Sequence, residues 1–160
     1  MRTVRKTRSR RPAAEEDLPA EASLWRYIES SALVAALVEH DAEAAAQISE
    51  IGRRTTSALT VAEATRAVIR ARVAGRLTPG EERAALRVMR HFAQRCVVMP
   101  VNDEILARAG KPFPVEPVRT LHAIHLATLE SLGETPQLVA VVTRDDRIAR
   151  NARALGYAVV

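Results

Sequence analysis

Three carboxylates and two imidazoles stand at positions where they could do chemistry: Glu29, Glu63 and Asp145, and His122 and His125. Carboxylate oxygens are the ligands that hard divalent cations require, and neutral imidazoles suit softer ions. His122 and His125 lie three residues apart, so on a helix they would share a face, as a metal-binding pair does. Each acid also has an ordinary explanation, because Glu63 suits the solvated face of an amphipathic helix and Asp145 suits a first helical turn. The residue types alone therefore leave a metal site and a set of solvated side chains both open.

The segments that carry these residues are predicted to alternate between strands and helices. Apolar or β-branched runs indicate strands over residues 24–29, 54–57, 96–101, 138–143 and 157–160. Helical spacing and capping residues indicate helices over 31–40, 41–51, 60–74, 79–94, 103–109, 119–132 and 145–155. Ser30 or Ser31 is the expected cap of the first helix, Thr78 and Asn102 are expected to cap two later ones, and the proline-containing segment 110–118 is expected to be a loop.

This alternation predicts an α/β fold, an α/β/α sandwich with a central parallel sheet of about five strands. The apolar run at residues 138–143 is nearly continuous, as expected for a strand buried on both faces. In such sheets, ligands bind beyond the carboxyl ends of the strands. Glu29 ends the first predicted strand and Asp145 follows the run at 138–143, so we expect both at that edge.

Composition divides the chain into a tail, residues 1–22, and one domain, residues 23–160. Six of the first eleven residues are Arg or Lys, acids follow at positions 15–17, and no periodicity is present, which predicts a disordered tail. The net charge is +5, of which the tail contributes +2. A basic balance suits a polyanionic partner such as RNA, but many proteins that bind no nucleic acid carry a similar charge. The charge therefore permits an RNA partner and does not require one.

Membrane and extracellular classes are disfavoured by the sequence. The longest uninterrupted apolar run, from Ala32 to Val38, is far shorter than the roughly 20 residues that cross a bilayer. No apolar stretch follows the basic start, so we expect no secretory signal. The single cysteine, Cys96, excludes an internal disulfide and a thiolate zinc site, and we expect it to be a small buried residue on a strand. The expectation is a cytoplasmic protein without membrane contact.

Four segments of the chain form an ordered pattern. They read YIESSAL from Tyr27, TSALTVAE from Thr56, RTLHAIHLAT from Arg119 and VTRDDRIA from Val142, and ARALG from Ala152 closes the pattern. Taken in order, these segments resemble the PIN-domain family, specifically the VapC-type toxins of bacterial toxin–antitoxin pairs. The resemblance covers residues 25–160. It implies a metal-dependent endoribonuclease in which four acids hold Mg²⁺ or Mn²⁺, and the ion activates a water and stabilises charge on the phosphate.

The family acids carry over to this chain with two departures. Glu63 and Asp145 match directly, whereas Glu29 and His122 stand where the family has Asp. The implied metal ligands are thus Glu29, Glu63, His122 and Asp145, with the three carboxylates as the catalytic residues. The longer Glu29 keeps the charge, but His122 replaces an anion with an imidazole, which suits Mn²⁺ better than Mg²⁺. The family commonly has a histidine at position 125 without a metal role, so we expect His125 to be a packed helix-face residue.

The resemblance also implies supporting residues and partners. Ser31, next to Ser30, fits the small hydroxyl after the first acid, Thr143 fits the hydroxyl that accompanies the last one, and Arg119 fits a basic residue that could contact RNA phosphate. The implied partners are an RNA substrate, a cognate antitoxin that covers the acidic pocket, and a second copy in a homodimer.

Two other functions compete with the ribonuclease. Because Glu29 and His122 replace the expected Asp, the chain could be a catalytically impaired PIN fold that binds RNA or a partner. A helical DNA-binding regulator is disfavoured by the apolar runs at 96–101 and 138–143.

Overall fold

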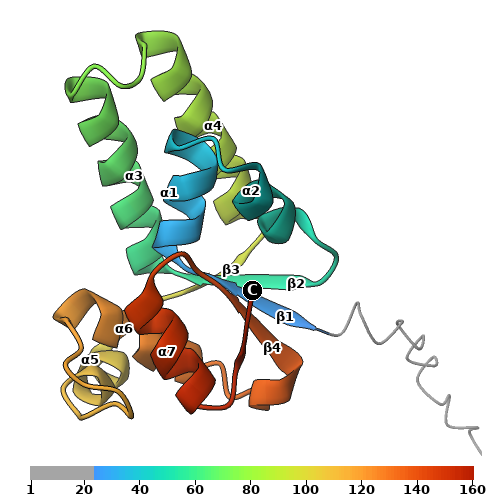
Figure 1. Cartoon of the computed structure of the whole chain (residues 1–160), viewed down its shortest axis with the longest axis vertical. Coiled ribbons are helices and arrows are strands. Elements are labelled where there is room, and N and C mark those ends of the chain that lie inside the picture. The colour runs from blue at the N-terminus through green and yellow to red at the C-terminus, as the bar shows by residue number, and fades with distance from the viewer. Residues whose placement is uncertain (1–23) are drawn as a thin grey trace, which may run out of the picture.

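The computed structural model describes residues 24–160, which form a parallel sheet covered by helices on both faces (Figure 1). The strands are β1 (Trp25–Ile28), β2 (Arg53–Ser57), β3 (Val97–Met99), β4 (Val139–Val142) and β5 (Ala158–Val159). The helices are α1 (Ser30–Val38), α2 (Ala42–Ser49), α3 (Ala58–Val73), α4 (Pro79–Gln94), α5 (Asp103–Ala109), α6 (Thr120–Glu130) and α7 (Asp146–Ala154), with a 3-10 turn at Pro136–Leu138. The predicted tail, residues 1–22, lies outside the described residues.

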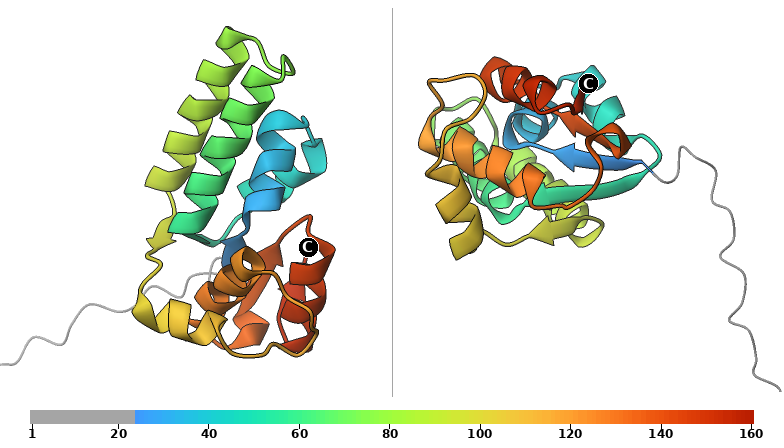
Figure 2. Two further views of the ribbon diagram at one scale, coloured as in Figure 1. Left: turned by 90° about the vertical axis from the view of Figure 1, so that its left-hand side faces the viewer. Right: turned by 90° about the horizontal axis from the view of Figure 1, so that it is seen from below.

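The five strands follow the order β3-β2-β1-β4-β5, and every neighbouring pair is parallel. Helices α1 to α4 lie on one face of the sheet and α5 to α7 on the other, as Figures 1 and 2 show from three directions. The predicted α/β/α sandwich with a five-stranded parallel sheet is therefore confirmed. In the described part of the chain, no helix is both long enough and apolar enough to span a bilayer.

The central strand β1 brings two distant segments to the same sheet edge. Ile28 is in register with Val142 of β4, and the backbone N–H of Glu29 donates to the carbonyl of Val142 at 3.0 Å. Glu29 therefore follows β1 at the level where Thr143 follows β4. Because parallel strands present their carboxyl ends together, as expected from the alternating pattern, this edge collects the candidate residues.

Side chains along β1 point alternately to the two faces of the sheet, and each face has its own hydrophobic core. Tyr27 is fully buried and packs with Leu129 of α6 and Val141 of β4 on the α5–α7 side. Ile28, the next residue, packs with Ala32 of α1 and Val142 on the opposite side. Burying each of these large side chains stabilises the fold by roughly 1.5–3 kcal/mol, so the sheet edge is held rigidly from both faces.

Several local predictions were wrong in detail. The cap of α1 is Glu29 and not Ser30 or Ser31, because the Glu29 side chain accepts from the Ser31 backbone N–H. Strand β3 ends at Met99, since Pro100 has no N–H to continue a ladder. Cys96 is half-buried in the bend before β3 and not on a strand, and burial raises the pKa of its thiol to about 11.

Candidate active site

Glu29 lies buried at the junction of β1 and α1, where its carboxylate is held by four protein donors. Its Oε1 accepts from the Ser30 hydroxyl at 2.6 Å. Its Oε2 accepts from the Ser31 backbone N–H at 2.9 Å, from the Ser31 hydroxyl, and from the Thr143 hydroxyl at 2.8 Å. Buried charge is tolerated only when hydrogen-bonded in this way. The Glu29 carboxylate thus caps α1 and at the same time bonds to Thr143 after β4.

Glu63 and His125 lie next to Glu29, and we call these three residues the acidic group. Glu63 comes from α3 and His125 from α6, and the His125 Nε2 lies 2.7 Å from Glu63 Oε2 and 3.6 Å from Glu29 Oε1. The side chain of His125 is only 1% exposed, whereas that of Glu63 is 27% exposed. Candidate ligand atoms of Glu29, Glu63 and His125 all lie within 4.8 Å of one another. The group is therefore closed by protein on the His125 side and open to solvent at Glu63.

The charge state of this group is set by its hydrogen bonds. Partial burial raises the pKa of Glu63, but hydrogen bonds from His125 and Ser30 and the nearby imidazoles outweigh it, so the pKa is lowered from its ordinary value. Glu63 is consequently an anion at neutral pH, as a ligand for a cation must be.

Tyr27 lies behind His125. Its fully buried hydroxyl is 3.3 Å from His125 Nδ1 and donates to the His125 carbonyl oxygen at 3.2 Å. Burial, followed by the negative charge of Glu29, raises the pKa of Tyr27 well above its ordinary value. The phenol therefore stays protonated and holds the ring of His125 from the core side.

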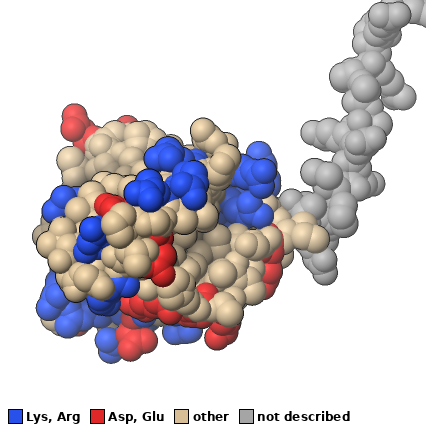
Figure 3. All heavy atoms as spheres, turned by 90° about the horizontal axis from the view of Figure 1, so that it is seen from above, with Lys and Arg blue, Asp and Glu red and all other residues tan. Residues whose placement is uncertain are grey.

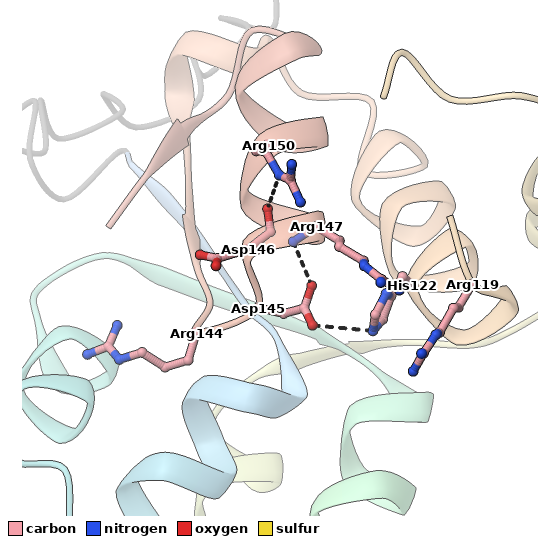
Figure 4. Close-up of a pocket in the computed structure, with 7 residues that line it drawn as sticks. All are labelled: Arg119, His122, Arg144, Asp145, Asp146, Arg147 and Arg150. Carbon is pink, nitrogen blue, oxygen red and sulfur yellow. Dashed lines mark hydrogen bonds and ion pairs between the residues drawn. The ribbon is translucent and has the colours of Figure 1, made fainter. Parts of the chain in front are cut away.

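Asp145 and His122 form a separate pair beyond the acidic group. Asp145 caps α7, and its Oδ1 accepts from the backbone N–H groups of Arg147 at 2.9 Å and Ile148 at 3.0 Å. Its Oδ2 lies 3.4 Å from His122 Nε2, and the two side chains are 29% and 21% exposed. Figure 4 shows the imidazole pointing toward this carboxylate. Because Asp145 is the anion within reach of His122, the imidazole lies with Asp145 and outside the cluster of Glu29, Glu63 and His125.

Thr143 connects the two parts of the site. Its hydroxyl donates to Glu29 Oε2 at 2.8 Å and accepts from the Asp145 backbone N–H at 3.1 Å. The Ser31 hydroxyl likewise accepts from the Arg144 backbone N–H at 2.7 Å. These bonds tie the loop after β4 to the start of α1, so the position of Asp145 depends on that of Glu29.

Arginines surround the pair formed by Asp145 and His122. A cavity of about 460 Å³ is lined by the two residues, by Asp146, and by the arginines at positions 119, 144, 147 and 150 (Figure 4). Arg144 is fixed by Asp41 at 3.0 Å and by Gln47 at 2.8 Å. Guanidinium groups match phosphate geometry, so the cavity suits a phosphate-bearing ligand. Elsewhere, on the face viewed in Figure 3, basic and acidic side chains are interspersed, and no single basic field covers it.

The structure therefore brings the predicted residues together in two groups. Glu29 and Glu63 converge, supported by Ser31 and Thr143, while His122, Asp145 and Arg119 line the adjoining cavity. His125 is buried, as predicted, but its position between the two glutamates was missed. Its three-residue spacing from His122 was the only signal in the sequence that pointed to it.

The donor set in the first group fits one divalent cation. Two carboxylate oxygens and an imidazole nitrogen lie close enough to share an ion, and the open side at Glu63 leaves room for water ligands. Mixed oxygen and nitrogen ligands favour Mn²⁺ over Mg²⁺.

Comparison with known proteins identifies close similarities over nearly the whole described chain. A family model described as PIN domain matches residues 26–154. Ribonuclease VapC46 of Mycobacterium tuberculosis is 36% identical over 138 residues, which cover 84% of this chain and 95% of that protein. Ribonuclease VapC35 of the same species is 33% identical over 139 residues, covering 84% and 94%.

Two solved structures share the fold. PAE2754 from Pyrobaculum aerophilum has a TM-score of 0.54 at 20% identity, covering 88% of this chain and 92% of that one. VapBC-1 from nontypeable Haemophilus influenzae has a TM-score of 0.52 at 13% identity, covering 86% and 97%. At these identities the likeness concerns the fold alone.

Proposed function

The chain belongs to the PIN domain family and is of the VapC type, and we propose that it is a metal-dependent endoribonuclease that hydrolyses RNA phosphodiester bonds as the toxin of a toxin–antitoxin pair. The main observation behind the proposal is that two sites lie next to each other at one edge of the sheet, the acidic group and the arginine-lined cavity. A carboxylate cluster that fits a divalent cation lies beside a cavity lined by four arginines. A metal-dependent nuclease needs both, one for the cation and one for the phosphate backbone.

The metal would be Mg²⁺ or Mn²⁺, held by Glu29 and Glu63, and the other two predicted ligands, Asp145 and His122, line the adjoining cavity. When bound, such an ion supplies an activated water and stabilises negative charge on the phosphate. The protein's own residues bind and orient the substrate. Arg119 and its neighbours in the cavity contact phosphate oxygens, and Thr143 keeps Asp145 in register with Glu29.

The partners follow from the same family membership. The proposed substrate is RNA, because the curated relatives are VapC ribonucleases, and the proposed protein partner is a cognate antitoxin, as the VapC resemblance implies. The antitoxin would cover the acidic pocket. We further propose a cytoplasmic site of action, where RNA is available, and the homodimer stays a prediction.

The test is a cleavage assay on a mixed pool of structured RNA, with Mn²⁺, with Mg²⁺ and with a chelator. The natural protein is expected to cleave with at least one ion and to stop with the chelator. Glu63→Gln is expected to lower the rate by about a hundredfold or more, the scale seen when a group that stabilises transition-state charge is removed. Glu104→Gln makes the same change on an exposed helix position of α5 and should leave the rate unaltered.

The rival function has its own signature in this assay. If the natural protein binds RNA in the arginine cavity but cleaves it with neither ion, the chain is a catalytically impaired binding module. The replacement of an expected acid by His122, which lies against Asp145, is the observation that favours this second candidate.

A further inference from the structure

The side chain of His125 is buried, but its ring nitrogen faces two carboxylates instead of apolar core residues. Its Nε2 points between the carboxylates of Glu29 and Glu63, at 3.6 and 2.7 Å, and the ring is almost completely buried. The residue that stands for the family's third acid, His122, lies instead against Asp145 at 3.4 Å. The acidic group therefore lacks a carboxylate and holds a buried nitrogen.

The lone pairs of Glu29 restrict how an ion could bind. Oε2 accepts three hydrogen bonds, from the Ser31 backbone, the Ser31 hydroxyl and Thr143, so it has no lone pair left. Oε1 accepts only one hydrogen bond, from Ser30, so it keeps a free lone pair. Oε1 is also the Glu29 oxygen that lies 3.6 Å from His125 Nε2. Glu29 can thus offer one oxygen, and an ion there takes its other ligands from Glu63, from a neighbouring side chain and from water.

The Tyr27 hydroxyl oxygen can accept a hydrogen bond from His125 Nδ1–H, and so allows the tautomer that coordination requires. Without metal, the Nε2–H of His125 donates to the Glu63 carboxylate at 2.7 Å. A coordinated cation would take the place of that proton, and the neutral ring would then carry its proton on Nδ1. The Tyr27 hydroxyl donates to the His125 carbonyl at 3.2 Å and keeps a lone pair for an Nδ1–H at 3.3 Å. Histidine ligands are commonly oriented by such a second hydrogen bond.

We propose that His125 Nε2 is a ligand of the divalent ion together with Glu29 Oε1 and Glu63 Oε2, and that Tyr27 positions the ring by accepting a hydrogen bond from Nδ1–H. The proposal rests on the proposed metal-dependent function and adds a nitrogen ligand to it. A site of two carboxylates and one imidazole prefers Mn²⁺ to Mg²⁺, because an imidazole nitrogen is a better ligand for the transition-metal ion Mn²⁺ than for the harder Mg²⁺.

Electron paramagnetic resonance with Mn²⁺ tests the proposal on the full chain without relying on activity. The loss of the free Mn²⁺ signal measures binding, and pulsed measurements detect a directly coordinated imidazole nitrogen. We expect a nitrogen signal in the natural protein, the same signal in His122→Asn, and no signal in His125→Asn. The His122 variant is the matched control, since it removes the other imidazole near the pocket.

Tyr27→Phe provides a second variant in case the buried His125→Asn variant does not fold. Loss of an outer hydrogen bond to a ligand typically weakens metal binding by about 10- to 100-fold, so Mn²⁺ should bind at least about tenfold more weakly to Tyr27→Phe. Unchanged affinity would overturn the role given to Tyr27.

The possible failures are distinguishable. If the natural protein binds Mn²⁺ without a nitrogen signal, or if His122→Asn abolishes that signal, His125 is not the ligand and the metal-dependent function survives. If the natural protein binds no Mn²⁺ at millimolar concentration, the metal dependence itself fails, and this inference with it.

Discussion

Replacing His122 with Asp would restore the carboxylate that the family has at this position, and the outcome tests how the present site works. The imidazole now lies 3.4 Å from Asp145 Oδ2, with both side chains between a fifth and a third exposed. His122→Asp removes this favourable pairing and places two carboxylates side by side. We expect a protein that is less stable without metal and that binds Mg²⁺ more tightly.

The magnitude follows from Coulomb's law. Two unit charges about 4 Å apart interact by about 1 kcal/mol in a medium like water, which is the appropriate limit for partly exposed groups. The metal-free variant should therefore lose about 1 kcal/mol of stability, which lowers the melting temperature by about 3 °C for a domain of this size. An Asp at position 122 that turns from Asp145 toward the cation and comes within about 4 Å of it adds about 2 kcal/mol to the binding, which corresponds to roughly thirtyfold tighter binding.

Calorimetric Mg²⁺ titration, thermal unfolding with and without Mg²⁺, and the RNA cleavage assay measure these effects. His122→Asn separates loss of the imidazole from gain of the charge. His91→Asp adds the same charge at an exposed position near the end of α4 and should leave Mg²⁺ affinity unchanged. If the natural protein cleaves well with Mg²⁺ and His122→Asp abolishes that activity, His122 is an adapted catalytic residue and the reasoning is refuted.

Three further predictions concern substrate binding, loop anchoring and acid stability. Arg150→Ala should weaken metal-free binding of all RNA sequences alike and reduce the salt slope of the affinity by about one, measured by titration at several salt concentrations; a sequence-dependent loss would contradict a phosphate contact. Asn151→Ala removes two buried hydrogen bonds to the backbone of Val115, each 2.9 Å, and should cost about 2–4 kcal/mol in urea unfolding; a cost below 1 kcal/mol would show that water replaces them. The pKa of Asp41 is lowered from 3.8 by the helix N–H that it caps and by Arg144, so its ionised form contributes stability above about pH 4 that is lost as the pH falls through the lowered value. The melting temperatures of the natural protein and Asp41→Asn should thus differ most at neutral pH and converge in acid, and a difference that persists in acid would exclude this charge as its source.

The elements whose ends carry strong local signals were predicted well from the sequence. Helix α5 was expected over residues 103–109 with Asn102 as its cap, and the structure has the same bounds and the same capping side chain. The capping box of Thr78 and Glu81 likewise starts α4 as expected. These boundaries depend on contacts within four residues, which a sequence displays directly.

The cap of α1 could not be predicted in the same way. Ser30 and Ser31 are the better capping residue types, yet Glu29 caps the helix because the strand β4 brings Thr143 against its carboxylate. That contact joins residues 114 positions apart. Local preference was overridden by a hydrogen bond that exists only once the sheet has formed.

The position of His125 was hidden for a related reason. His122 and His125 differ by about 60° around a helix with 3.6 residues per turn, so either could face the acids. An amphipathic stripe normally fixes the rotation of a helix, but α6 is buried at every residue from Ala123 to Leu129 and has no such stripe there. The rotation is set by packing on β1 and α3, through contacts with Tyr27 and Glu63, 98 and 62 residues away.

Of the two departures from the family pattern, only His122 changes the charge of the site, because Glu29 keeps the charge of the expected Asp. Glu29 and Glu63 together carry the charge that one dication neutralises, and a neutral His125 can complete that group without adding to it. Asp145 is compensated separately, by two backbone N–H groups, by His122 and by the arginines of the cavity. Replacing a fourth acid with an imidazole lowers the repulsion that four clustered carboxylates would create without metal. In this interpretation the site is divided into a half that holds the cation and a half that binds phosphate, and His122 belongs to the second half.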